Sequence, residues 1–148
     1  MKVGQNRLCG IIYLTQVIMS YRKLINTHPS MPKGCFFAFS NKQFEEGVKK
    51  NELDGVKIYH AGAGLYGTKE AIKAFLNGYD ARAERIKKEC TPQEVYEYEY
   101  DNHECGYVCD DTEAVECCLA YFSLEDCNAI NRRHICQTIE DIQKEMKR

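Results

Sequence analysis

The chain has 148 residues, of which 44% are hydrophobic and 28% are charged, with three prolines and a net charge of −2. This length is enough for one domain with its own core, and the composition excludes a disordered or collagen-like chain. Its nine cysteines have no regular spacing and do not match the framework of a small secreted protein, so we expect reduced thiols in the cytoplasm.

The first 19 residues contain an apolar run at positions 8–19 that follows two basic residues. This run is too short to cross a bilayer, and it lacks a small-x-small cleavage pattern, so we expect neither a membrane segment nor secretion. We interpret residues 1–19 as an N-terminal extension, which translation from Met19 would largely omit. Residues 20–148 are then a single domain.

The next part of the chain predicts a helix, a strand and a second helix. A short helix over residues 20–27 ends before two prolines, which favour an extended connection. The run CFFAF at residues 35–39 is short, continuous and aromatic, as in a buried strand. Ser40 or Asn41 then caps a helix that continues to about residue 50.

A second strand and a long helix follow. Residues 56–60 alternate apolar and polar side chains, as a half-buried strand does, and the glycine-rich turn at 62–67 is expected to enclose another short strand. Thr68 then caps a helix to about residue 89, whose apolar residues recur every three or four positions on one face. We expect a small antiparallel sheet of three or four short strands.

Residues 91–94 combine a capping-box threonine and glutamate with proline at the first helical position, which predicts a helix start. The alternation that follows, at residues 96–101, also fits a strand of period two. However, Tyr96, Tyr100 and His103 share one helical face, so the capping signal favours the helix.

The rest of the chain predicts one more strand and further helices. Residues 105–109 are expected to form a last short strand, and Asp110 or Asp111 to cap a helix that ends near Phe122. Ser123 starts another helix that continues, with a break, to the C-terminus. Together the elements predict an α+β fold with the small sheet packed by four or five helices.

The charge is distributed very unevenly. Residues 94–131 carry 11 acidic and no basic side chains, whereas residues 1–93 carry 15 basic and 8 acidic ones. Tyrosines beside these acids suit a protein interface, because tyrosine gives rigid contact area and acidic groups steer basic partners. The alternative is that the tyrosines lie in the core while the acids face water.

We therefore hypothesise a non-enzymatic protein that binds a basic protein or nucleoprotein partner. Such a protein needs no cofactor, does not bind nucleic acid through its acidic face and does not enter a membrane; the sequence is also compatible with a homo-oligomer. The residues expected to contact the partner are Tyr96, Glu97, Tyr98, Glu99, Tyr100, Asp101, His103, Glu104, Asp110, Asp111 and Glu113.

The first alternative is a small zinc-binding module or enzyme. His103, Cys105 and Cys109 are its candidate ligands, with Cys90 or Cys127 as a fourth, although the close C-x-x-C pairs typical of zinc sites do not occur. Sequence reasoning does not identify a catalytic residue among them.

The second alternative is a nucleotide-binding domain. Residues 62–67 match G-x-G-x-x-G after a predicted strand. In a dinucleotide fold the helix begins across these glycines, whereas here it begins at Thr68, after the third one. Asp80 lies within the helix rather than at the end of a following strand, so a tight glycine turn explains the motif better.

Three stretches resemble a known family. Residues 36–47 (FFAFSNKQFEEG), the glycine turn before Lys69 and residues 98–104 (YEYDNHE) are similar to a family of small uncharacterised proteins of bacteria, their phages and mobile elements. The resemblance carries no activity. It implies an accessory protein of a phage or mobile element in the bacterial cytoplasm. In that setting, the acidic tyrosine-rich surface suggests an inhibitor of a host defence complex, of the anti-CRISPR kind, that competes for a basic partner.

Overall fold

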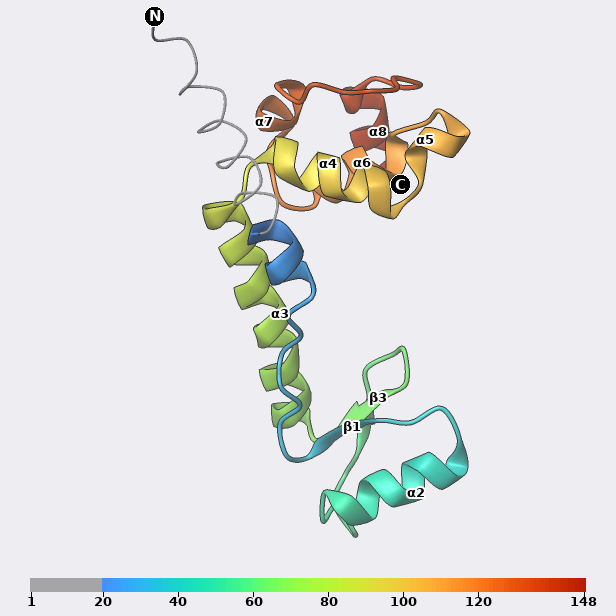
Figure 1. Cartoon of the computed structure of the whole chain (residues 1–148). Helices are drawn as coiled ribbons and strands as arrows, with labels where there is room; N and C mark the ends of the chain where they lie inside the picture. The colour runs from blue at the N-terminus through green and yellow to red at the C-terminus, as the bar shows by residue number, and fades with distance from the viewer. Residues whose placement is uncertain (1–19) are drawn as a thin grey trace, which may run out of the picture. The chain divides into compact units, whose positions relative to one another are not determined.

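The structure, a computed structural model, describes residues 20–148 (Figure 1). The expected N-terminal extension over residues 1–19 lies outside the described residues. The described residues divide into two compact units, His28–Arg82 and a unit that joins residues 20–27 with Ala83–Arg148. A domain boundary at residue 20 stays a prediction.

The unit His28–Arg82 contains a three-stranded antiparallel sheet in the order β1-β3-β2. Its strands are β1 (Cys35–Phe37), β2 (Tyr59–His60) and β3 (Leu65–Gly67). Helix α2 (Asn41–Lys50) follows β1, and the Ser40 side chain caps it by accepting a hydrogen bond from the Gln43 N–H at 3.3 Å. Helix α3 (Lys69–Glu89) begins in this unit.

This unit confirms the α+β class and the small antiparallel sheet, with shorter strands than expected. The strand predicted over residues 35–39 ends at Phe37, and the one over 56–60 keeps only Tyr59–His60. The strand at 56–60 starts late because the Val56 N–H donates to the Leu53 carbonyl at 3.0 Å, which keeps the chain in a turn at this point.

The glycines at residues 62–67 close the hairpin between β2 and β3. Gly62 and Gly64 have positive φ angles of 90° and 75°, which glycine adopts without strain. Gly67 pairs within β3, where an added Cβ would lie 2.4 Å from the Gly34 carbonyl oxygen. These glycines therefore serve the sheet, and helix α3 begins only after them.

The other unit is helical. Residues 20–25 are helical, and its further helices are α4 (Pro92–Asn102), α5 (Cys105–Val108), α6 (Thr112–Leu119), α7 (Leu124–Asn128) and α8 (Ile139–Met146). Helix α4 packs against α6, and α6 against α8 (Figure 1). Fully buried side chains in the core of this unit are Tyr21, Ile86, Val95, Tyr96, Ala114, Val115, Cys118, Cys127 and Ile142.

Local signals set the start of α4 as expected. The Thr91 side chain accepts from the Glu94 N–H at 3.3 Å, and the Glu94 carboxylate accepts from the Thr91 N–H at 2.6 Å. This capping box confirms the helix over the competing strand. For α6, Asp110 rather than Asp111 supplies the local contact, because its carboxylate accepts from the Thr112 N–H at 2.9 Å.

The strand predicted over residues 105–109 is wrong, because Cys105–Val108 form the short helix α5. A strand needs a hydrogen-bonding neighbour, and every strand of the described residues lies in the other unit. Glu104 and Cys109 flank the turn with left-handed φ angles of 53° and 54°. Cys105 is buried as a core residue.

Candidate metal centre

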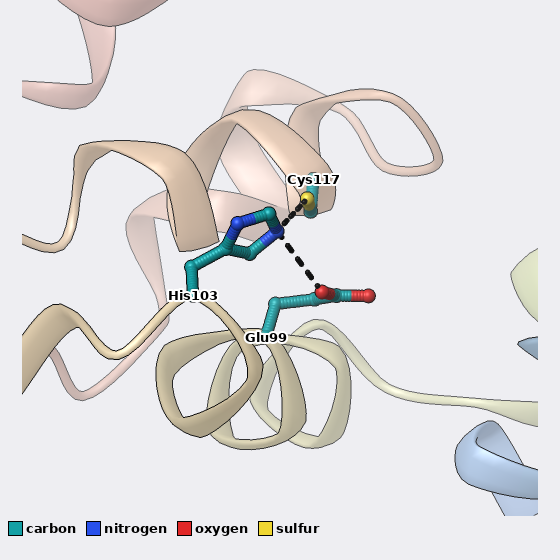
Figure 2. A group of neighbouring side chains, drawn as sticks. All are labelled: Glu99, His103 and Cys117. Atoms are coloured by element: carbon teal, nitrogen blue, oxygen red, sulfur yellow. Dashed lines mark hydrogen bonds and ion pairs between the residues drawn. The ribbon is translucent and has the colours of Figure 1, made fainter.

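Three potential metal ligands converge from α4 and α6. Glu99 and His103 lie four residues apart, on one face at the end of α4, and Cys117 faces them from α6 (Figure 2). The Nε2 atom of His103 lies 3.3 Å from Glu99 Oε2 and 3.6 Å from Cys117 Sγ. The three ligand atoms all lie within 4.8 Å of one another.

The two separations from His103 Nε2 fit a tetrahedral zinc ion. Zinc binds histidine nitrogen at about 2.0–2.1 Å, carboxylate oxygen at about 2.0–2.2 Å and cysteine sulfur at about 2.3 Å. At the tetrahedral angle, a nitrogen ligand then lies about 3.4 Å from an oxygen ligand and about 3.6 Å from a sulfur ligand. The observed distances of 3.3 Å and 3.6 Å agree with both values.

A second layer of side chains orients the ligands. The Nδ1 atom of His103 lies 2.8 Å from Glu113 Oε2 and donates to it, since an ionised carboxylate only accepts. This bond leaves the lone pair on Nε2, which is the ring nitrogen that lies near Glu99 and Cys117. A metal-binding histidine typically has its second nitrogen held by a carboxylate in this way.

The Glu99 carboxylate is also held on both oxygens. The buried Tyr21 hydroxyl donates to Oε1 at 2.6 Å, and the Asn102 amide donates to Oε2 at 3.0 Å. Glu99 is only 5% exposed, so its charge is removed from water. Burying a carboxylate requires compensation by hydrogen bonds or a cation, and these contacts supply part of it.

A histidine cation could bridge Glu99 and Glu113 without a metal. That arrangement accounts less well for two features. The distance of 3.3 Å between His103 Nε2 and Glu99 Oε2 is longer than the usual 2.7–3.2 Å of an N–H···O bond. The Cys117 sulfur would make only a weak hydrogen bond with His103 Nε2 at 3.6 Å, whereas a soft cation uses all three residues as ligands.

Cys117 is poorly suited to act as a nucleophile. Burial raises its pKa to about 12, and the negative charge of Glu99 adds to the shift. A catalytic cysteine needs a lowered pKa, because the thiolate is the reactive form. A bound divalent cation reverses this situation, since a coordinated thiol is deprotonated.

Of the candidate zinc ligands suggested by the sequence, only His103 lies in this group. Within residues 20–148 the group of potential metal ligands contains neither Cys105 nor Cys109. Cys105 lies in the core and Cys109 is exposed, while Cys90 and Cys127 are buried elsewhere among apolar side chains. The residues that the structure brings together as potential metal ligands are therefore Glu99, His103 and Cys117.

Four residues expected at a partner surface lie in the interior: Tyr96, Glu99, Tyr100 and Asp111. Their expected surface position is wrong, because α4 turns the face that carries Tyr96 and Tyr100 toward the core. The others keep partial or full exposure: Glu97, Tyr98, Asp101, His103, Glu104, Asp110 and Glu113. Their contact with a partner stays a prediction.

Asp111 is buried with its own counter-ion. Arg132 donates to both of its oxygens, at 2.8 Å from Nε and 2.5 Å from Nη2, and the Tyr96 hydroxyl donates to Oδ2 at 2.9 Å. Arg133 forms a further ion pair with Glu97 on the surface. Basic residues near the C-terminus thus neutralise part of the acidic segment.

Sequence reasoning missed two residues of this site, Cys117 and Tyr21. The spacing of Glu99 and His103 was available as an i, i+4 pair once α4 was read as a helix. Cys117 offered no such signal, because it is brought to His103 only by the packing of α6 on α4. Tyr21 lies 78 residues before Glu99, so the sequence contained no indication of their contact.

Comparisons with known proteins give a family but no activity. Residues 22–147 match the sequence model of a family of unknown function (DUF7659). No curated protein matches the chain, and no solved structure matches it. Among the helices of residues 20–148, none combines the length and the apolar character that crossing a membrane requires.

Proposed function

The chain belongs to this family of unknown function, DUF7659, and we propose from its ligand geometry that it is a metal-binding protein. The site takes a zinc-class divalent cation on Glu99 Oε2, His103 Nε2 and Cys117 Sγ. One nitrogen, one oxygen and one sulfur ligand suit zinc, which is borderline-soft and accepts all three types. The sequence alone predicted no cofactor, so this proposal rests on tertiary structure.

The agreement of the two ligand separations with tetrahedral zinc carries the proposal. The contact from His103 Nδ1 to Glu113 supports it independently, because it leaves the ring in the tautomer that a metal needs. Three protein ligands leave the fourth position to water or to an external ligand. The ion joins α4 to α6, and at a free concentration of 1,000 times Kd it stabilises the fold by about 4 kcal/mol.

Metal content tests this function directly. Untagged protein, purified without chelators, is expected to contain close to one equivalent of zinc by elemental analysis. After the metal is removed, cobalt(II) should restore one equivalent, with a thiolate-to-cobalt charge-transfer band and the intense visible bands of tetrahedral cobalt. Protein that takes up neither ion at micromolar concentration would refute the proposal.

Variants assign the ligands. Cys117→Ser should abolish the thiolate-to-cobalt band, and His103→Gln should weaken zinc binding by at least about 100-fold, since each removes one of three ligands. Cys109→Ser is the matched control, because Cys109 is exposed and outside the group. Circular dichroism of each variant separates loss of metal from loss of fold. Equal zinc affinity in all three variants would exclude this site.

The protein-binding role expected from the sequence is a second proposal, and one surface feature favours it. A pocket of about 270 Å³ in the helical unit is lined by Tyr100, Asp101, Glu104, Gly106 and Tyr107. Two carboxylates beside a tyrosine that is 88% exposed suit a lysine or arginine side chain of a partner. Val108, next along the chain, adds apolar surface at 71% exposure.

In this second proposal the chain is an accessory protein of a phage or mobile element that binds a basic host protein, such as a component of a defence complex. The phage or mobile-element origin is supported by the sequence resemblance. The binding of a basic protein is supported by the negative charge of the pocket. Capture of a partner from host lysate should weaken with salt and be lost in Asp101→Asn/Glu104→Gln. Glu125→Gln/Glu140→Gln, which removes the same charge elsewhere, should bind as the unmodified protein does. Equal capture by both variants would reject this surface.

A further inference from the structure

Cys109 and Cys136 lie against each other on the surface of the helical unit. The thiol of Cys136 donates to the carbonyl oxygen of Cys109 at 3.2 Å, although the two residues are 27 positions apart in the chain. Both are exposed, whereas Cys35, Cys90, Cys105, Cys118 and Cys127 are buried. They are therefore the two most accessible thiols among the described residues.

The backbone on both sides of this pair is anchored. Arg132, four residues before Cys136, binds the buried Asp111, and its Nη1 donates to the Gln137 carbonyl at 2.8 Å. His134 contacts the Tyr100 hydroxyl. On the other side, the Asp110 N–H donates to the Cys105 carbonyl at 3.2 Å. These contacts keep the two segments in register even if the thiols change partners.

The contact brings the two cysteines side by side. A disulfide needs Cα atoms about 4.4–6.8 Å apart, and the hydrogen bond of 3.2 Å from the Cys136 thiol to the Cys109 carbonyl oxygen holds the two residues in direct contact. The Cys109 thiol now donates to the Gly106 carbonyl at 3.7 Å. Its side chain must rotate away from that carbonyl to meet the Cys136 sulfur.

We propose that Cys109 and Cys136 form a disulfide when the protein meets a two-electron oxidant such as a peroxide. The thiolate of one cysteine attacks the peroxide oxygen, becomes a sulfenic acid and releases hydroxide. The thiol of the other then attacks this sulfur, forms the S–S bond and releases water. The hydroxide takes up the proton that the first thiol lost, so two thiols are oxidised and one peroxide is reduced to two waters.

The disulfide fastens residues 131–137 to the turn between α5 and α6. This segment has no regular secondary structure, and it carries Ile135, which is 68% exposed. The cross-link closes a long loop, so oxidised protein should melt several degrees higher than reduced protein. Cross-linking therefore makes an exposed surface more rigid in an oxidising environment.

Oxidation followed by peptide mapping tests the proposal. The full chain is used with Cys9→Ser, because Cys9 lies outside the described residues. Treatment with hydrogen peroxide, alkylation of the remaining thiols and digestion should give the Cys109–Cys136 peptide as the main cross-linked product, with a loss of two hydrogens in intact mass. The preference for the Cys109–Cys136 cross-link should disappear when the protein is oxidised in urea, where it is unfolded.

Two variants separate this result from the metal proposal. Cys136→Ser should prevent the cross-link and the rise in Tm, while Cys117→Ser should retain both, because Cys117 belongs to the metal ligands and not to the pair. The proposal is overturned if other cysteine pairs dominate in folded protein, or if Cys109 and Cys136 are recovered separately alkylated or oxidised. Either result leaves the zinc measurements unaffected.

Discussion

The Nδ1 atom of His103 lies 2.8 Å from Glu113 Oε2, and this contact determines which ring nitrogen is available to a metal. Replacing Glu113 by glutamine keeps the size of the side chain and removes its charge. We expect Glu113→Gln to lower zinc affinity by about 10–100-fold, because the histidine becomes less basic and less firmly oriented. Calorimetric titration of the metal-free protein measures this.

The control for this change is Glu104→Gln, which removes a carboxylate one residue from His103 on the exposed surface. It should bind zinc as the unmodified protein does. A Glu113→Gln protein with unchanged affinity would mean that the carboxylate does not orient the ligand.

Tyr21 is expected to support both the fold and the site. Its hydroxyl donates to Glu99 Oε1 at 2.6 Å, and burial together with this carboxylate raises the pKa of Tyr21. Tyr21→Phe leaves the buried carboxylate short of one donor and should cost about 1–3 kcal/mol in free energy of unfolding. Urea denaturation of the metal-free protein measures that cost.

The matched control for Tyr21 is Tyr107→Phe, which removes the same atom from a side chain that is 88% exposed. Its free energy of unfolding should change by less than about 0.5 kcal/mol. Equal effects of the two substitutions would show that the Tyr21 bond adds no stability.

The buried pair of Asp111 and Arg132 predicts non-additive mutations. Arg132→Met leaves the buried carboxylate without its counter-ion and should cost about 3–5 kcal/mol. The double variant Asp111→Leu/Arg132→Met should recover much of this loss, since no buried charge remains. Arg85→Met, which breaks an exposed pair with Glu89, should cost less than about 1 kcal/mol. The prediction is contradicted if the double variant loses the sum of the free energies of unfolding that the two single variants lose.

Buried thiols predict a loss of stability in alkali. Burial raises the pKa of Cys127 from 9.0 to about 11. Between these values the unfolded thiol has lost its proton and the folded one has not, so the folded state binds more protons and stability falls as pH rises. The contribution of Cys127 to the free energy of unfolding is complete below pH 9 and is lost by about pH 11.

Thermal unfolding under reducing conditions from pH 8 to pH 11 measures this dependence. Cys127→Ala should lower Tm at pH 8, because it leaves a cavity, but should show a smaller further decrease toward pH 11 than the unmodified protein. Cys109→Ala, at an exposed thiol, should keep the full decrease. If Tm falls in parallel with pH in all three proteins, groups other than Cys127 cause the loss of stability in alkali.

The elements whose signals are local could be predicted from the amino-acid sequence. The capping box at Thr91 and Glu94 set the start of α4, and the Ser40 cap set α2, because each joins atoms only three residues apart. The same spacing rule places Glu99 and His103 on one helical face. The acidic character of residues 94–131 could also be read directly from composition.

Long-range packing determines which of those acids are buried and which side chains meet. Glu99 is buried because Tyr21 reaches it from 78 residues away, and Asp111 because Arg132 reaches it from 21 residues away. The contact of Cys117 with His103 exists because α6 packs on α4. A buried carboxylate needs a partner, and no local pattern reveals a partner that folding alone brings near.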